Sequence, residues 1–110
     1  MRETIIKHLI NLDKPIDEIK KSLKGLGWDS DDEITMAKGS VKSILNRYIE
    51  SNIDSKTLNE WANTIEGRED IDYDESCFNE IKQLVYEIAN PDLEGPFDIE
   101  KAKGWLSKLD

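Results

Sequence analysis

The sequence predicts an all-α protein: a compact bundle of five or six short helices that forms one domain over residues 1–110, with at most one very short strand near residues 33–36. Two observations support this fold class. Apolar residues recur at intervals of three and four positions, as on one face of a helix, and Gly, Pro, Asn or Asp separates one such stretch from the next. The length suits a single core. Hydrophobic residues make up only 37% of the chain and charged residues 35%, so most of each helix surface should face water.

The N-terminal part is predicted to contain two helices separated by Asp13-Lys14-Pro15. The first covers about Glu3 to Asn11. Pro15 can occupy the first turn of the second, because its missing N–H needs no partner there. Gly25 and Gly27 can adopt positive φ and are expected to end this helix. The inward-facing residues are Ile5, Ile6, Leu9 and Ile10 in the first helix and Ile16, Ile19, Leu23 and Leu26 in the second.

Residues 28–35 are predicted to form a polar loop. At its end, Ile34 and Met36 alternate with polar neighbours, which is the pattern of a very short strand, but a ladder needs two strands and no partner is evident. The next helix runs from about Lys38 to Ser51 and has the clearest amphipathic pattern of the chain, and Asn52 suits a left-handed exit from it. The apolar face of this helix carries Val41, Ile44, Leu45, Tyr48 and Ile49.

Three more helices are predicted in the C-terminal half. Asp54 is a good N-cap for the first of them, and Gly67 ends it. A helix over about Ser76 to Ala89 follows, and residues 91–97 connect it to a last helix capped by Asp98. The apolar faces carry Leu58, Trp61, Ala62 and Ile65; then Phe78, Ile81, Leu84, Val85 and Ile88; then Ile99, Ala102, Trp105, Leu106 and Leu109.

The net charge of −9 is concentrated in two segments. Residues 29–33 contribute −4, and residues 66–75, with six acids and one base, contribute −5; the rest of the chain balances 14 acids with 14 bases. Such a charge distribution repels a phosphate backbone and an anionic membrane surface. Nucleic acid and membrane are therefore not expected as partners, whereas a basic protein would be attracted and steered.

Cysteine content and the absence of long apolar runs predict a cytoplasmic protein. Cys77 is the only cysteine, so no intramolecular disulfide can form, which is typical of a reducing cytosol. The apolar pair Ile5-Ile6 is interrupted at once by Lys7-His8. No run is long enough for a signal peptide or a membrane span.

The sequence does not favour a catalytic or cofactor site. His8 and Cys77 are the only histidine and thiol. A catalytic pair would need further groups in set roles, and the two residues have simpler interpretations, as a boundary side chain and a packing residue. One Cys and one His cannot form a zinc site. The acidic stretches that start at Asp29 and Asp70 lack the glycine and glutamate that a calcium loop requires. We therefore expect a binding protein without a cofactor rather than an enzyme.

The two acidic segments allow two interpretations. They can be solvated loops that keep the protein soluble, with Asp74 or Ser76 capping the next helix and Arg68 neutralising its neighbours. Alternatively, they form one negative surface for a cationic partner, because the charge is concentrated and Trp28, Ile71 and Tyr73 lie among or beside the acids as apolar anchors. A tryptophan beside a polar loop is also a common core residue. The predicted partner-binding residues are Asp29, Asp31, Asp32, Glu33, Glu69, Asp70, Asp72, Tyr73 and Asp74.

Five stretches between residues 26 and 97 also carry a family resemblance. They are Trp28-Asp29-Ser30-Asp31-Asp32-Glu33, Arg47-Tyr48-Ile49, Leu58-Asn59-Glu60-Trp61-Ala62-Asn63, Ile65-Glu66-Gly67-Arg68-Glu69-Asp70-Ile71 and Ala89-Asn90-Pro91-Asp92-Leu93-Glu94-Gly95-Pro96. Together they resemble small bacterial proteins of toxin–immunity loci and are similar to the immunity proteins of contact-dependent growth inhibition systems. The resemblance implies a cytoplasmic inhibitor that binds the toxic domain of a cognate effector and blocks its active site. Many such toxins are nucleases with basic substrate grooves, which an acidic surface could occupy. The family has no fixed functional residues to transfer, so the residues named above rest on charge and apolar anchors.

An alternative is a regulatory or adaptor module, in which the amphipathic helices hold a partner helix or a second copy of the chain. The response to salt would distinguish the two functions. Binding in an apolar groove should persist at high salt, whereas recognition by the acidic segments should weaken. The oligomeric state is left open by both.

Overall fold

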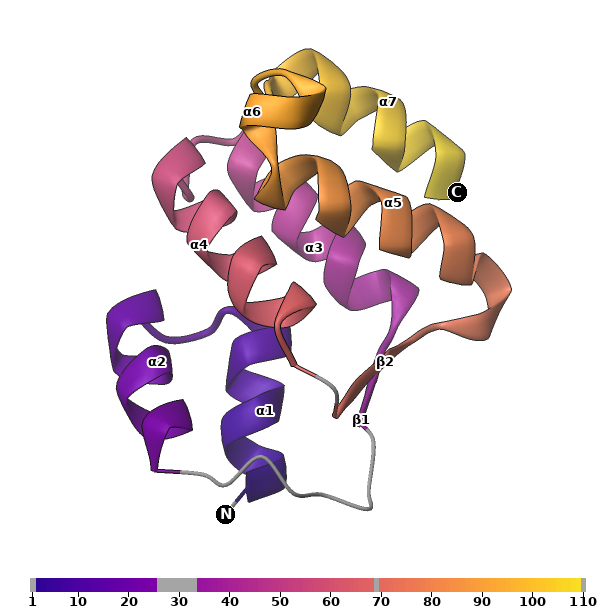
Figure 1. Ribbon diagram of the computed structural model, residues 1–110. Helices are drawn as coiled ribbons and strands as arrows, with labels where there is room; N and C mark the ends of the chain where they lie inside the picture. The colour runs from indigo at the N-terminus through magenta and orange to yellow at the C-terminus, as the bar shows by residue number, and fades with distance from the viewer. Residues whose placement is uncertain (1, 26–33, 69, 110) are drawn as a thin grey trace.

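Seven α-helices and two three-residue strands make up the described part of a computed structural model of the protein, residues 2–25, 34–68 and 70–109 (Figure 1). In chain order the elements are α1 (Arg2–Asn11), α2 (Ile16–Lys24), β1 (Ile34–Met36), α3 (Lys38–Ile49), α4 (Ser55–Glu66), β2 (Ile71–Tyr73), the 3-10 helix η1 (Glu75–Cys77), α5 (Phe78–Ala89), α6 (Pro91–Glu94) and α7 (Ile99–Leu109). The predicted mostly helical fold is confirmed. None of the described helices combines the length and the apolar character that crossing a membrane would require.

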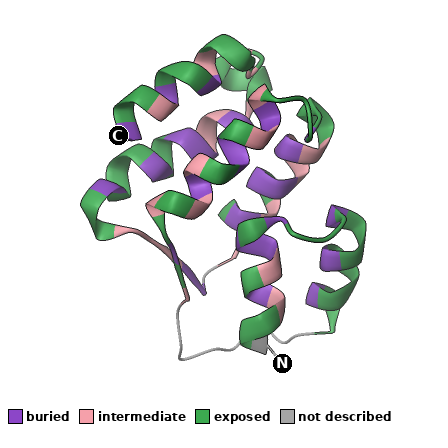
Figure 2. Ribbon diagram, turned by 180° about the vertical axis from the view of Figure 1, so that it is seen from behind, coloured by how far each residue is buried: buried purple, intermediate pink, exposed green. Residues whose placement is uncertain are grey.

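The helices pack around α3, which runs through the centre of the molecule (Figure 1). Helices α4 and α5 pack along one another, and α7 packs against α3. At the other end, α1 contacts α2 and α3. Except on α6, which has no buried residue, buried residues face inward on the helices and exposed residues face outward (Figure 2), as the amphipathic patterns predict. The buried apolar residues of all these helices form one cluster.

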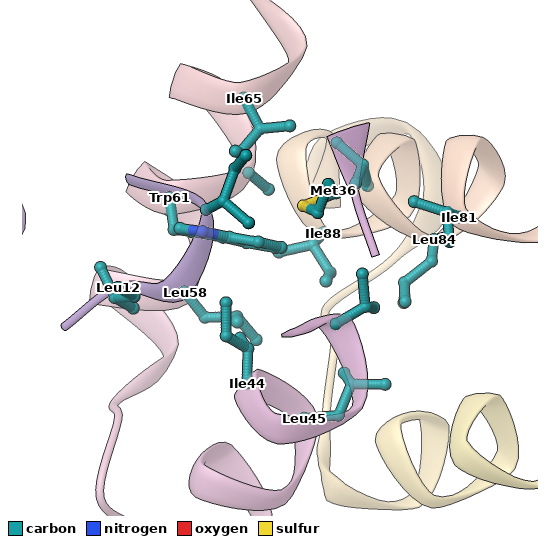
Figure 3. Packing of buried hydrophobic residues seen from close by; sticks show 14 of the residues in the cluster. Leu12, Met36, Ile44, Leu45, Leu58, Trp61, Ile65, Ile81, Leu84 and Ile88 are labelled. Carbon is teal, nitrogen blue, oxygen red and sulfur yellow. The ribbon is translucent and has the colours of Figure 1, made fainter. Parts of the chain in front are cut away.

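Trp61 of α4 is a large core side chain and is only 1% exposed. Its indole Nε1–H donates a hydrogen bond of 2.8 Å to the carbonyl of Leu9 in α1, so the polar edge of the ring is satisfied inside the core. The ring lies among apolar side chains of several elements, including Met36 of β1 (Figure 3). Trp105, 7% exposed, is also a core residue, as predicted. Trp28 lies outside the described residues.

The ends of the helices agree with the predictions in position but not always in conformation. Asp54 caps α4, because its Oδ1 accepts a 2.7 Å hydrogen bond from the backbone N–H of Thr57. The left-handed exit after α3 falls on Ser51, with φ of 66°, one residue before the predicted Asn52. Gly25 follows α2 with φ of −79°. The prediction of a positive φ there was wrong, since the backbone simply continues in the right-handed region.

Strands β1 and β2 pair in parallel at one flank of the helical bundle (Figure 1). Ile34 pairs with Ile71, and Met36 pairs with Tyr73. The crossover between the strands contains α3 and α4, as a parallel connection requires a long excursion. The short strand predicted near residues 33–36 is thus confirmed, and its partner lies within the acidic segment 66–75, which was predicted to be a loop.

The predicted connection 91–97 contains a further short helix, α6. Gly95 follows it with φ of 85° and ψ of 159°, a conformation that is open to glycine almost alone. The amine of Lys101 donates a 2.8 Å hydrogen bond to the carbonyl of Pro96, and the hydroxyl of Tyr48 donates one of 3.1 Å to the carbonyl of Phe97. These bonds hold the connection against α3 and α7.

Candidate binding surface around strand β2

The structure describes four of the residues predicted to bind a partner: Asp70, Asp72, Tyr73 and Asp74. The others, Asp29, Asp31, Asp32, Glu33 and Glu69, lie outside the described residues. The four described residues lie on or beside β2, so this strand is the centre of the candidate surface.

The sheet joins Ile34, the first described residue after the segment 29–33, to the second acidic segment. Ile34, the residue that follows the first segment in the sequence, donates its backbone N–H to the carbonyl of Asp70 in the second, at 2.9 Å. At the other end of the strands, the N–H of Asp74 donates to the carbonyl of Met36 at 3.1 Å. Parallel pairing therefore places the start of β1 beside the start of β2, at the same end of the sheet.

Asp70 is buried, unlike the partner-facing acid that was predicted. Its side chain is 5% exposed and that of Arg68 is 8% exposed. The guanidinium of Arg68 donates from Nε to Oδ1 at 2.9 Å and from Nη2 to Oδ2 at 2.6 Å. The hydrogen-bonded Asp70 carboxylate raises the pKa of Arg68 above its usual value. This two-pronged ion pair cancels the charge of Asp70, so Asp70 contributes little to an external negative surface.

Asp74 caps two helices at once. Its Oδ2 accepts a 3.0 Å hydrogen bond from the backbone N–H of Lys38 at the start of α3. Its Oδ1 accepts bonds from the backbone N–H of Ser76 at 3.1 Å and from the hydroxyl of Ser76 at 2.8 Å. Two sets of donors lower the pKa of Asp74 below its usual value: the backbone N–H of Lys38 has the larger effect, and the Ser76 groups add to it. The predicted capping role is confirmed, and the bond to Lys38 adds a link to a distant element.

Asp72 and Tyr73 lie on opposite faces of β2, because successive side chains of a strand alternate. Asp72 is paired with Thr35 and is partly exposed beside this exposed residue. Tyr73 is half-buried, and its ring makes a tilted contact with that of Phe78, with centroids 5.6 Å apart. Burial raises the pKa of the Tyr73 hydroxyl most, and the negative charge of Glu66 raises it further.

Phe78 and Ile99 were both predicted to face the core, but each is 39% exposed. They stand at the first positions of α5 and α7, where a helix reaches the rim of the bundle and only part of a side chain is covered. Phe78 therefore adds an aromatic surface next to Tyr73 and the acids of β2.

A groove of about 560 Å³ runs between β2 and the outer face of α5. We call it the β2–α5 groove; it is lined by Glu66, Tyr73, Asn79, Lys82, Gln83 and Tyr86. Four of these positions, 79, 82, 83 and 86, are spaced as neighbours on one face of a helix. The groove was not predicted from the sequence, because the prediction for this helix used only its apolar face. The polar stripe that follows the acidic segment is the sequence feature that indicates the groove.

The only histidine and the only cysteine occupy ordinary structural positions. Nδ1 of His8 lies 2.6 Å from Oδ1 of Asp13. Cys77 is a free, buried thiol, and the hydroxyl of Ser76 donates to its sulfur at 3.8 Å. Within the described ranges, no three His, Cys, Asp or Glu side chains lie close enough together to hold a metal ion.

No protein-family model, curated protein or solved structure matches this chain. The resemblance to immunity proteins therefore stays a prediction from the sequence motifs.

Proposed function

We propose that the protein is a cytoplasmic immunity protein that binds a cognate bacterial toxin domain, a basic nuclease domain, and occludes its active site with an acidic surface. The observation that carries this proposal is the concentration of the net charge of −9 in two segments. Ile34, which follows the first segment in the sequence, hydrogen bonds to Asp70 of the second. A nuclease groove that attracts phosphates also attracts carboxylates.

Several acids around β2 remain available to such a partner. Glu66 and Glu75 are exposed, and Asp72 is partly exposed. Asp74 keeps its negative charge while it caps two helices, because its donors are neutral N–H and O–H groups. Among the described acids of this segment, Asp70 has its charge cancelled by Arg68. Glu66, Asp72 and Glu75 thus present negative charge to solvent.

Aromatic side chains beside these acids support a stable complex. Exposed ion pairs alone contribute little affinity, and interfaces depend on a few well-packed anchors, often aromatic. Tyr73, which lines the β2–α5 groove, and Phe78, whose ring contacts that of Tyr73, provide an aromatic pair. The pair can bury apolar area while Glu66, Asp72 and Glu75 meet basic groups of the partner.

Co-expression with the product of the neighbouring gene tests the proposal. We expect one-to-one complex formation and rescue of cells from that product's toxicity. The double variant Asp72→Asn/Glu75→Gln should weaken both. As a control, Asp92→Asn/Glu94→Gln removes two exposed charges from α6, away from the sheet (Figure 1), and should leave both unchanged. Absence of a complex and of rescue with the unmodified protein would refute the proposal.

Exposed apolar residues favour a second candidate function, the regulatory or adaptor module. Leu93 of α6 is 71% exposed and Ile99 of α7 is 39% exposed. If they hold a partner, binding should persist in high salt and be lost in the variant Leu93→Ser. A complex that weakens with salt and tolerates Leu93→Ser argues for recognition by the acidic surface instead.

A further inference from the structure

The hydrogen bonds of the sheet leave one edge of β2 open. In a parallel pair, each strand directs the N–H and C=O groups of alternate residues to its neighbour. The carbonyl of Asp70 and the N–H of Asp74 are bonded to β1, so residues 70, 72 and 74 face β1. Ile71 and Tyr73 must then direct their N–H and C=O groups to the opposite edge. No described residue forms a hydrogen bond with these groups there.

An open strand edge is a template for another strand. The edge of β2 offers the backbone groups of two residues, Ile71 and Tyr73, whereas the outer edge of β1 offers those of Thr35 alone. Tyr73 also borders the β2–α5 groove, so side chains of an added strand have a recess beside the edge. The edge of β2 is therefore the better template of the two.

The charges around this edge define the kind of strand that fits it. Glu66, Asp72 and Glu75 carry exposed or partly exposed carboxylates, and Lys82 is the only base among the described residues that line the groove. Side chains of a strand alternate between the two faces of the sheet. A partner strand would thus place every second side chain on the face of Asp72, where a Lys or Arg is favoured opposite an acid. The intervening side chains would lie on the face of Tyr73, where apolar residues are favoured.

We infer that an extended segment of the toxin domain, with Lys or Arg alternating with apolar residues, adds as a third strand to the open edge of β2. This inference rests on the proposed function, because it specifies how the same surface binds its partner. Backbone hydrogen bonds to Ile71 and Tyr73 align the segment, and the acids around the edge select a basic sequence.

A peptide titration followed by NMR tests the edge without the toxin. The probe is the blocked hexapeptide Lys-Val-Lys-Val-Lys-Val, and the control is Glu-Val-Glu-Val-Glu-Val. We expect the basic probe to shift the amide signals of Ile71 and Tyr73 and to slow their hydrogen exchange about tenfold. The amides of Asp72 and Asp74 should exchange slowly even without the probe, because β1 accepts from them. If the basic probe leaves Ile71 and Tyr73 unaffected, or if the acidic peptide acts equally well, the inference is wrong.

Two variants of one residue test the edge in the complex with the product of the neighbouring gene. Tyr73→Ala removes the side chain and keeps the N–H. Tyr73→Pro also removes the N–H, which the pairing with β1 does not use, and proline is tolerated at such edge positions. We expect Tyr73→Pro to weaken binding about tenfold more than Tyr73→Ala. Circular dichroism of both variants checks the fold. If Tyr73→Pro is unfolded, hydrogen exchange of the Ile71 and Tyr73 amides in the unmodified complex tests strand addition instead.

The outcomes separate this inference from the proposed function. If the unmodified protein binds while the two variants are equally weak and both amides stay unprotected, strand addition is refuted and the immunity function stands. If no complex forms, the proposed function fails, and the peptide titration still decides whether the edge accepts a basic strand.

Discussion

Single residues of the acidic segment 66–75 differ widely in what they do. Asp70 is enclosed in an ion pair with Arg68, Asp74 links the starts of α3 and η1, and Asp72 stays partly exposed. All three are aspartates in one short stretch. The residues that each contacts in the fold determine whether it stabilises the protein or is available for binding.

Arg68→Met should destabilise the protein by about 3 kcal/mol, because it leaves the buried carboxylate of Asp70 without its partner. Urea unfolding followed by tryptophan fluorescence measures the loss. In the double variant Arg68→Met/Asp70→Leu no buried charge remains, so most of the stability should return. A loss well below about 1 kcal/mol in the single variant would show that water reaches Asp70.

The stability contributed by Asp74 should disappear in acid. Its pKa is lowered in the folded protein by the N–H groups that it accepts from, so the unfolded chain binds a proton at higher pH than the folded one. This contribution is therefore complete above the ordinary aspartate pKa of 3.8 and is lost as the pH falls through the lower pKa of the folded state. Urea midpoints measured from neutral to acid pH should fall less steeply for Asp74→Asn than for the unmodified protein. Asp92→Asn, which removes an exposed acid from α6, should keep the full slope.

Among the elements, α1 depends on a side chain of α3 for its C-terminal end. The last carbonyls of a helix have no partner within it. The guanidinium of Arg47 donates from Nη1 to the carbonyl of Asn11 at 3.0 Å and from Nη2 to that of Leu12 at 2.9 Å. Leu12 has φ of 48°, so Arg47 holds the turn at which the chain leaves α1.

Arg47→Lys should cost about 1–2 kcal/mol of unfolding free energy, because an ammonium group cannot reproduce the two parallel donors of a guanidinium. Arg47→Met should cost at least as much. Thermal and urea unfolding measure both variants, with Lys20→Met on the exposed face of α2 as a control that should be neutral. Equal stability of Arg47→Lys and the unmodified protein would show that one donor suffices.

The elements also show what the sequence could and could not predict. Helices α3 and α4 are visible from periodicity and caps, because those signals lie within about a dozen residues. Strand β2 is not, since Ile71-Asp72-Tyr73 forms a strand only through pairing with the distant β1. The burial of Asp70 was hidden for the same reason: Arg68 is close in the sequence, but the sheet beside the pair forms only through pairing with the distant β1.

At the scale of the whole molecule, the imbalance of charge should govern how fast a partner arrives. The chain carries −9 in two segments and is neutral elsewhere, so a basic partner should be drawn to these segments rather than to the surface at large. Contacts at the aromatic pair of Tyr73 and Phe78 should instead govern how long the complex lasts.

The association rate constant with the proposed toxin should fall about 10- to 100-fold between about 0.02 M and about 0.5 M salt, while the dissociation rate changes little. Stopped-flow tryptophan fluorescence measures both rates. Phe78→Ala should raise the dissociation rate and leave the salt dependence of association intact. Association that is indifferent to salt would rule out electrostatic steering by the acidic segments.

The bond from Lys38 to Asp74 joins residues 36 positions apart, and the same long span closes the two-stranded sheet. Closing such a span costs chain entropy that short-range helices do not, and contacts between distant positions are generally acquired slowly during folding. The edge of β2 therefore exists only in a chain that has closed the long span containing α3 and α4. A nascent or truncated chain that ends before residue 71 lacks the strand altogether, so recognition through this edge would be reserved for molecules that have finished folding.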